Sequence, residues 1–153
     1  MKIKAVYFAL FVLFACACQQ EQASENQVAT PGMPVAAPDN GGITLPENFG
    51  AVVVADSAGR ARHLAISQNG NIYIKLRRLN SNGNGIVMLQ DTTGDGQQDI
   101  VQAFGDFGGT GIAFHNNYLY ASSDTEVFRY PLDENGEVAP GTRPDTVVTG
   151  FLP

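Results

Sequence analysis

The sequence predicts an all-β fold from residue 45 onward. Short apolar runs alternate with polar residues, clusters of Asn, Gly and Asp separate the runs, and no segment carries apolar residues at helical spacing. Valine-rich runs around Val53, Val101 and Val148 also recur at intervals of 48 and 47 residues. A unit of this length with four short strands is typical of one blade of a β-propeller. The sequence therefore predicts a partial β-propeller, and a plain sandwich or meander is the alternative.

Length and charge limit the function classes. The chain has 153 residues, which allows one domain at most, and its 16% of charged residues is too low for a disordered or coiled-coil protein. The net charge of −6 argues against general electrostatic attraction to nucleic acid or to an anionic membrane surface. We therefore expect no nucleic-acid partner.

Residues 1–18 are expected to be an export signal. Lys2 and Lys4 form a short basic start, and the 14 uncharged residues that follow are too few for a membrane-spanning helix. The end of this segment resembles a bacterial lipobox, with Cys16 as the expected lipidated residue and Cys18 as the alternative. The sequence thus predicts an exported bacterial lipoprotein, periplasmic or on the cell surface and anchored to the membrane by its lipid. An ordinary cleaved signal with two incidental cysteines is the other possibility.

Cleavage of this signal would change the properties of the mature chain. Both cysteines lie within the signal, so no disulfide is expected to support the fold. Loss of Lys2 and Lys4 leaves seven basic against 15 acidic residues, a net charge of −8. Residues 19–44 are rich in Gln, Asn, Ala, Pro and Gly and predict a flexible linker before the domain at 45–153.

Two segments of the domain are copies of each other at the same interval. Residues 63–74 align with residues 111–120, and each copy is an apolar strand, a tight turn containing Asn and a second apolar strand. The pattern predicts four strands in each of two blades: 62–67, 71–76, 85–90 and 99–105, then 110–115, 118–122, 125–131 and 145–149.

One further strand is expected at 51–55, in the phase of an outer strand. A lone outer strand at the start of a propeller usually completes the last blade of a closed ring. Closed propellers have typically 4 to 8 blades. We therefore expect this chain to be the amino-terminal part of a longer propeller, with the remaining blades outside it, or else a unit that must associate to hide its open edges.

Four loops are expected to gather at one face around the propeller axis: 57–62, 75–84, 104–110 and 122–124. The first two contain five of the nine basic residues of the chain, and no acidic residue occurs from Ser57 to Gln90: the five are Arg60, Arg62, Lys75, Arg77 and Arg78. Because Arg recognises carboxylate and phosphate through a planar pair of donors, these residues predict a site for an anionic ligand. The alternative is a solvated loop that pairs with acidic residues of absent blades.

The two histidines receive different interpretations. His63 stands where the chain enters the innermost strand of the first blade. A histidine there could abstract a proton from a substrate hydroxyl, because its ordinary pKa is near neutral pH. A packing role is the alternative. His115 is expected at the opposite face, as a structural residue.

The segment Asp91–Asp99 has acidic residues at loop positions 1, 5 and 9 and Gly at position 6, as in an EF-hand-like calcium loop. Asp91, Asp95 and Asp99 are therefore candidate metal ligands. Thr93 stands where Asp or Asn is usual, and a strand follows where a helix would be expected. A tight turn between outer strands explains the same residues.

Several segments, taken in their order, resemble the opening of the sorbosone/glucose dehydrogenase-like family. They are residues 45–56, 59–73, 91–99, 109–115 and 117–130. The resemblance implies a secreted quinoprotein propeller with about six blades and pyrroloquinoline quinone (PQQ) as cofactor. It also implies oxidation of a sugar, polyol or aldehyde by hydride transfer to the quinone, with a His as base and calcium beside the cofactor.

The chain is shorter than the members of the family that it resembles. The family's chain continues well past the equivalent of residues 149–153, and its best-known base-bearing segment follows that point, so we expect a partial dehydrogenase, inactive by itself. The alternative is a non-enzymatic propeller lipoprotein that binds a carbohydrate or a protein partner, because one propeller scaffold serves many functions.

Overall fold

The structure, a computed structural model, describes residues 32–152. This part of the chain is all-β, apart from one short 3-10 turn, η1 (Asn40–Gly42). Within it, no helix has the length and apolar character needed to cross a bilayer. The predicted signal and both candidate lipidation sites, Cys16 and Cys18, lie outside the described residues.

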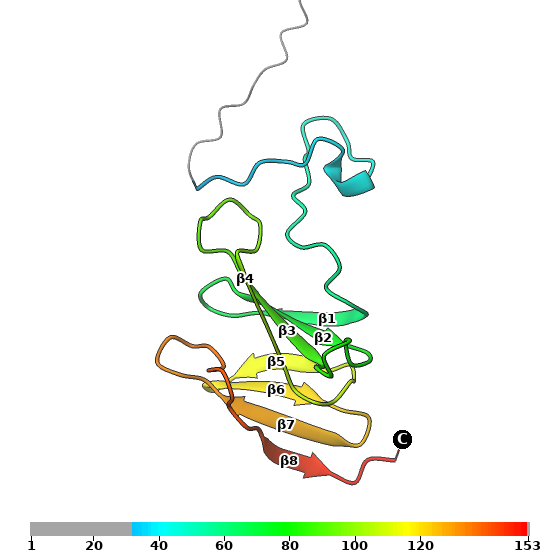
Figure 1. Cartoon of the computed structure of the whole chain (residues 1–153), viewed down its shortest axis with the longest axis vertical. Helices are drawn as coiled ribbons and strands as arrows, with labels where there is room; N and C mark the ends of the chain where they lie inside the picture. The colour runs from blue at the N-terminus through cyan, green and yellow to red at the C-terminus, as the bar shows by residue number, and fades with distance from the viewer. Residues whose placement is uncertain (1–31, 153) are drawn as a thin grey trace, which may run out of the picture.

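The eight strands form two antiparallel sheets, each a simple up-and-down meander (Figure 1). Blade one has the order β1-β2-β3-β4 and blade two the order β5-β6-β7-β8. The bounds in blade one are β1 (Ala61–Ile66), β2 (Ile72–Leu76), β3 (Ile86–Gln90) and β4 (Ile100–Phe104). Those in blade two are β5 (Ile112–His115), β6 (Tyr118–Ser122), β7 (Glu126–Pro131) and β8 (Asp145–Thr149).

This architecture confirms the predicted partial β-propeller. All eight predicted blade strands are present, and each begins and ends within two residues of its expected bounds. The innermost strands β1 and β5 contact each other, and the two sheets do not close into a ring within residues 32–152.

The ninth predicted strand, at 51–55, is not a strand in the structure. Its residues are half-buried, but only one backbone hydrogen bond joins it to blade one, from the Gln98 N–H to the Val54 carbonyl oxygen at 3.0 Å. Val54 and Ala55 pack beside an apolar cluster on the outer face of blade one, which includes Leu76. The apolar pattern at 51–55 therefore reflects side-chain packing, without the ladder of backbone bonds that defines a strand.

The main core lies between the two blades. Tyr73, Ile86 and Met88 of blade one pack against residues of blade two, among them Leu119 and Tyr130. Aromatic rings cross this boundary in edge-to-face pairs: Tyr73 with Phe114 and Phe104 with Tyr130, each with ring centroids 5.1 Å apart. Because burial of large apolar side chains is the dominant favourable term in folding, this interface holds consecutive blades together.

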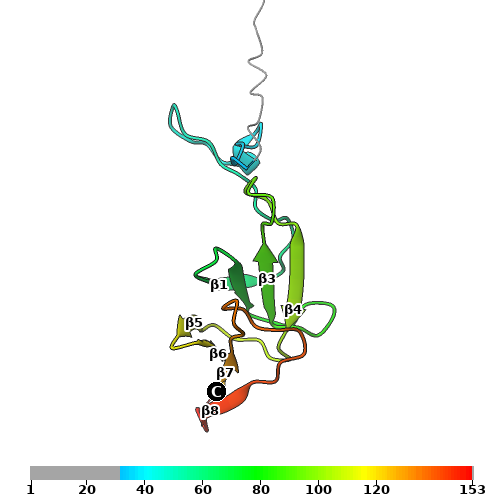
Figure 2. The ribbon, with the colours of Figure 1, turned by 90° about the vertical axis from the view of Figure 1, so that its left-hand side faces the viewer.

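Residues 32–54 extend beyond the sheets at the end where β3 and β4 are joined (Figures 1 and 2). They contact that connection, since a Cβ placed on Gly96 would lie 3.0 Å from the Pro34 Cβ and 3.1 Å from the Val52 Cγ1. The end of the predicted linker also has local structure, because the Asn40 side chain accepts a hydrogen bond from the Ala51 N–H at 3.0 Å.

Candidate functional site

The four loops predicted to share a face do meet there. They line a cavity of about 390 Å³, and each contributes at least one residue: Arg62, Arg77, Arg78, Gly109, Thr110 and Asp124. We call this cavity the arginine pocket. It combines residues 62 and 77–78 of blade one with residues 109, 110 and 124 at the start of blade two.

A bulge in β1 sets the position of Arg62. Ala61 pairs with Leu76 and His63 with Lys75, so Arg62 has no partner of its own on β2. A bulge residue is released from the regular alternation of the sheet, and bulges often re-aim a side chain next to a functional site. Arg77 and Arg78 follow the end of β2, where the Arg77 N–H donates to the Arg60 carbonyl oxygen at 3.0 Å.

The connection from β4 to β5 forms another wall of the arginine pocket, and it needs glycine there. A Cβ on Gly108 would lie 2.5 Å from the Arg77 carbonyl oxygen, and one on Gly109 would lie 2.1 Å from the Ser122 carbonyl oxygen. The Gly109 N–H also donates to the Leu76 carbonyl oxygen at 3.1 Å. The connection thus passes between the ends of β2 and β6, where no side chain fits.

The charge of the pocket is net positive, with three guanidinium groups and one carboxylate in its lining. Within residues 32–152, the salt bridge between Arg129 and Asp145 is the one ion pair closer than 4.0 Å. Asp124 therefore lines the pocket without pairing closely with any of the three arginines. Their planar donors are available to a ligand, and carboxylates and phosphates match them best.

Lys75 does not line this pocket, contrary to the sequence-based prediction. It belongs to β2 and is fully buried, and its ammonium group donates to the carbonyl oxygens of Phe107 at 2.6 Å and Gly85 at 3.4 Å. Burial lowers the pKa of Lys75 to about 8, and the charge of Asp124 partly opposes this shift. Lys75 therefore supports the β4–β5 connection from below the arginine pocket.

The alternation of residues along β2 already indicates that Lys75 is buried. Tyr73 and Lys75 are two residues apart on β2, so their side chains share one face of the sheet, and Tyr73 is buried between the blades. Arg60 also departs from the prediction, because it is exposed and does not line the cavity. Of the five predicted basic residues, the structure brings together Arg62, Arg77 and Arg78.

The structure separates the histidines from this pocket. His63 is exposed on β1 beside Arg62 but is not part of the pocket lining, so a role as base stays a prediction. His115 ends β5 and is exposed, with its ring centroid 6.5 Å from that of Tyr120. It borders a different cavity at the opposite face of the blades, which agrees with its predicted placement, and its structural role stays a prediction.

All three carboxylates of the Asp91–Asp99 loop accept hydrogen bonds from the loop's own backbone. Asp91 accepts from the N–H groups of Gly96 at 2.8 Å and Gly94 at 2.6 Å, and Asp99 accepts from the Thr92 hydroxyl at 2.7 Å. These hydrogen bonds lower the pKa of both carboxyls. The Gly96 N–H has the largest effect on Asp91, and the Thr92 hydroxyl has the largest effect on Asp99.

This geometry does not support the predicted metal site at Asp91, Asp95 and Asp99. The Asp95 carboxylate also accepts from a backbone N–H, that of Gln97 at 2.8 Å. Across residues 32–152, no group of three or more acidic, His or Cys side chains is arranged to hold a metal ion. The turn interpretation accounts for the acidic residues, because short Asp side chains satisfy backbone donors in tight loops.

Sequence reasoning missed Asp124 and Thr110 as lining residues, although both lie in loops that it assigned to this face. Whether a loop residue lines the pocket depends on the direction of its side chain. Sequence periodicity predicts that direction in regular strands but not in loops.

The chain matches no protein-family model and no curated protein. Similar solved structures include the calcium and iodide structures of a carbohydrate-active enzyme of family AA12 from Trichoderma reesei. Each has 21% sequence identity and a TM-score of 0.53, over 84% of this chain and 30% of the solved chain. At this identity the likeness shows the fold alone, and this chain spans less than a third of the length of the solved one.

Proposed function

We propose that this chain is part of an exported PQQ-dependent dehydrogenase that oxidises a sugar, polyol or aldehyde. The observation that carries the proposal is the arginine pocket, where four loops of two blades bring three arginines without close acidic partners to one face. The fold shared with a carbohydrate-active enzyme and the resemblance to the sorbosone/glucose dehydrogenase-like family support the same class of substrate.

The residues of the arginine pocket fit the proposed cofactor. PQQ carries three carboxylates, and Arg62, Arg77 and Arg78 offer guanidinium groups that bind carboxylates through paired donors. When bound, this group would accept hydride from the substrate carbon. The arginines would bind and orient its carboxylates, and the close approach of Gly108 and Gly109 would fix the adjacent wall.

The proposed reaction also needs a base that accepts the proton of the substrate hydroxyl. His63 stands beside Arg62 on the same strand and remains the candidate within this chain. The resemblance implies that a base from a later blade completes the site, so we propose that the two blades alone bind ligand weakly and do not turn over. The loop Asp91–Asp99 is not proposed as a calcium site, because no group of three or more acidic, His or Cys side chains within residues 32–152 is arranged to hold a metal ion.

The proposed location is outside the cytoplasm, at the membrane through a lipid on Cys16, or on Cys18 as the alternative. The segment 1–18 carries this part of the proposal. Labelling with a radioactive fatty acid in a bacterial host tests it, with Cys16→Ser and Cys18→Ser as paired variants. Absence of label from the unaltered chain would contradict the lipid anchor and leave the arginine pocket unaffected.

Binding of PQQ to the chain itself tests the pocket. We expect PQQ to bind and raise the midpoint of thermal unfolding, and Arg77→Ala with Arg78→Ala to weaken binding roughly tenfold or more, because hydrogen bonds to charged groups are lost. Arg143→Ala is the matched control, since Arg143 is exposed and lies outside the pocket. The uncharged trimethyl ester of PQQ should bind far more weakly.

Equal loss of affinity in the Arg143→Ala variant, or equal binding of the trimethyl ester, would contradict the assignment of the pocket. The activity is tested on the full-length product with PQQ and calcium added, following dye reduction with aldoses as substrates. Failure to reduce dye, together with tight PQQ binding, would reject the dehydrogenase while keeping the anion site.

A further inference from the structure

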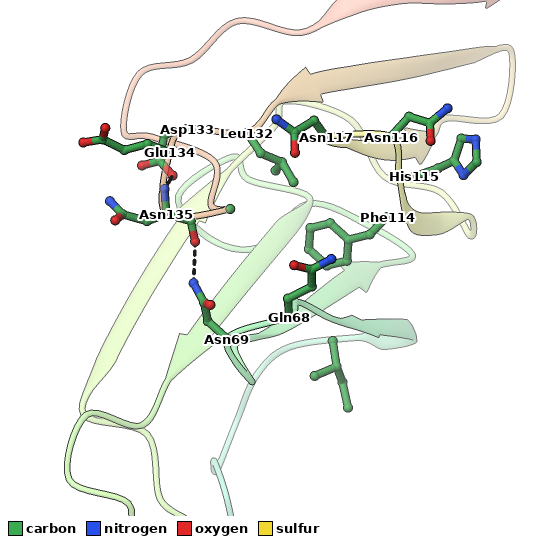
Figure 3. A pocket seen from close by; sticks show the side chains of 12 residues that line it. Gln68, Asn69, Phe114, His115, Asn116, Asn117, Leu132, Asp133, Glu134 and Asn135 are labelled. Atoms are coloured by element: carbon green, nitrogen blue, oxygen red, sulfur yellow. Dashed lines mark hydrogen bonds between the residues drawn. The ribbon is translucent and has the colours of Figure 1, made fainter.

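A second cavity lies at the opposite end of the same two blades. It has a volume of about 480 Å³ and is formed by the β1–β2 turn, the β5–β6 turn and the first part of the β7–β8 connection. We call it the amide groove. In Figure 3 the side chains of Phe114, Leu132 and Gln68 point into this groove, whereas His115 points away from it.

The floor and the rim of the amide groove differ in polarity. Ile66, Phe114 and Leu132 give it an apolar floor, and Ile66 keeps 60% of its surface exposed although it ends an inner strand. Amide side chains surround this floor: Gln68, Asn69, Asn116, Asn117 and Asn135. Each amide both donates and accepts hydrogen bonds.

Local backbone requirements explain part of the rim. Asn116 and Asn117 have φ values of 44° and 64°, as the tight turn between β5 and β6 requires, and Asn is tolerated there. The Asn69 amide donates to the Asn135 carbonyl oxygen and so joins the two blades across the groove. The Gln68 side chain makes no hydrogen bond within residues 32–152, and the exposed side chain of Ile66 is not explained by the turn geometry either.

The charges around the groove disfavour an ionic ligand. No Lys or Arg lines it, which argues against an anion. The Oδ1 atom of Asp133 accepts from the N–H groups of Asn135 at 2.9 Å and Glu137 at 3.0 Å, and Glu134 is the other acidic lining residue. These two carboxylates do not form a cation site, because no group of three or more acidic, His or Cys side chains within residues 32–152 is arranged to hold a metal ion.

We propose that the amide groove binds a neutral oligosaccharide. Sugar hydroxyls both donate and accept hydrogen bonds, as the amides do, and the C–H face of a sugar ring is apolar, as the floor is. This site is separate from the arginine pocket and stands whether or not that pocket binds PQQ. The amide groove would hold a glycan chain at one face of the propeller, and the arginine pocket lies at the opposite face.

The test is calorimetric titration of the whole chain with neutral oligosaccharides: cellohexaose, xylohexaose and mannohexaose. We expect at least one to bind, and Gln68→Ala to weaken that binding about threefold to tenfold through loss of one neutral hydrogen-bonding group. Gln97→Ala is the matched control, because Gln97 is an exposed amide on the β3–β4 loop and lies outside the groove. Phe114→Leu should add to the loss by removing the ring from the floor.

Several outcomes would overturn the proposal: no binding of the three probes at millimolar concentration, equal loss in Gln68→Ala and Gln97→Ala, or tighter binding of an oligogalacturonate. The variant with Arg77→Ala and Arg78→Ala should bind the probes unchanged. If that variant loses glycan binding while Gln68→Ala keeps it, the sugar occupies the arginine pocket, which would reject the amide groove and support the proposed dehydrogenase. Circular dichroism and unfolding midpoints verify that each variant is folded.

Discussion

The ammonium group of Lys75 lies 2.6 Å from the carbonyl oxygen of Phe107 and 4.1 Å from the centroid of the Phe107 ring. One buried cation thus holds both the backbone and the side chain of the β4–β5 connection, the segment that forms a wall of the arginine pocket. Phe107 in turn stacks on Phe128 of blade two, with ring centroids 4.3 Å apart. Lys75 therefore links blade one to blade two beneath the candidate site.

Burial of Lys75 should make stability depend on pH. Its pKa of about 8 in the folded chain lies below the ordinary value of 10.5, so the unfolded chain binds this proton more tightly. The free energy of unfolding should therefore rise between pH 8 and 10, by up to about 1.4 kcal/mol per pH unit. Urea unfolding at several pH values measures the slope.

Lys75→Met is the control for that slope, because it removes the titrating group and keeps a long side chain. The unaltered chain and the variant should diverge between pH 8 and 10. Parallel profiles would show that Lys75 does not carry the effect. The window ends near pH 10, where tyrosine ionisation begins and the raised pKa values of Tyr73 and Tyr130 act in the opposite direction.

Gly85→Ala should be strongly destabilising. A Cβ on Gly85 would lie 1.8 Å from the Phe107 carbonyl oxygen, so the β4–β5 connection would have to move, at a cost of about 3 kcal/mol or more. Gly83→Ala is the matched control, because Gly83 has φ of 79° and no atom within 4 Å of its added Cβ. It should cost only about 1 kcal/mol. Equal costs in chemical denaturation would contradict this close approach.

Tyr73→Phe should lower the free energy of unfolding by about 1 kcal/mol. The buried Tyr73 hydroxyl accepts from the Val138 N–H at 3.3 Å, and its removal leaves that donor without a partner. The comparison is Tyr118→Phe, because the Tyr118 hydroxyl makes no hydrogen bond within residues 32–152 and its loss should be close to neutral. If the two variants are equally stable, the Tyr73 hydroxyl does not hold the β7–β8 connection.

Asp91→Asn should destabilise the chain at neutral pH, because a carboxylate is a stronger acceptor for the N–H groups of Gly96 and Gly94 than an amide oxygen. The pKa of Asp91 is lowered on folding, so its contribution is present above its ordinary value near 3.8 and is lost as pH falls through the lower, folded value. Unfolding curves of the chain and the variant should therefore converge in acid.

The same loop predicts that calcium has no effect. The unfolding midpoint should be equal in millimolar calcium chloride and in EDTA, since the acidic side chains are directed to backbone donors. A midpoint that rises with calcium in the unaltered chain and stays constant in Asp91→Asn would restore the metal interpretation of Asp91–Asp99.

Local sequence patterns predicted much of the fold. Alternation of apolar residues located the eight blade strands, and the interval of 47 to 48 residues divided them into two blades. The same reasoning assigned a strand to 51–55, which has the right side chains but one backbone bond to blade one. Apolar alternation reports burial of side chains, whereas a strand also requires a neighbour in register.

The sequence by itself determined the strand order, the loops that share a face and the presence of positive charge in those loops, because each depends on residue types at fixed local spacing. Only the tertiary structure decided which charges face a ligand: it directed Arg62, Arg77 and Arg78 to the arginine pocket and enclosed Lys75 beneath it. It also joined three separate turns into the amide groove. The physical reason is that exposure of a side chain depends on segments distant in sequence, here the β4–β5 connection packed over β2.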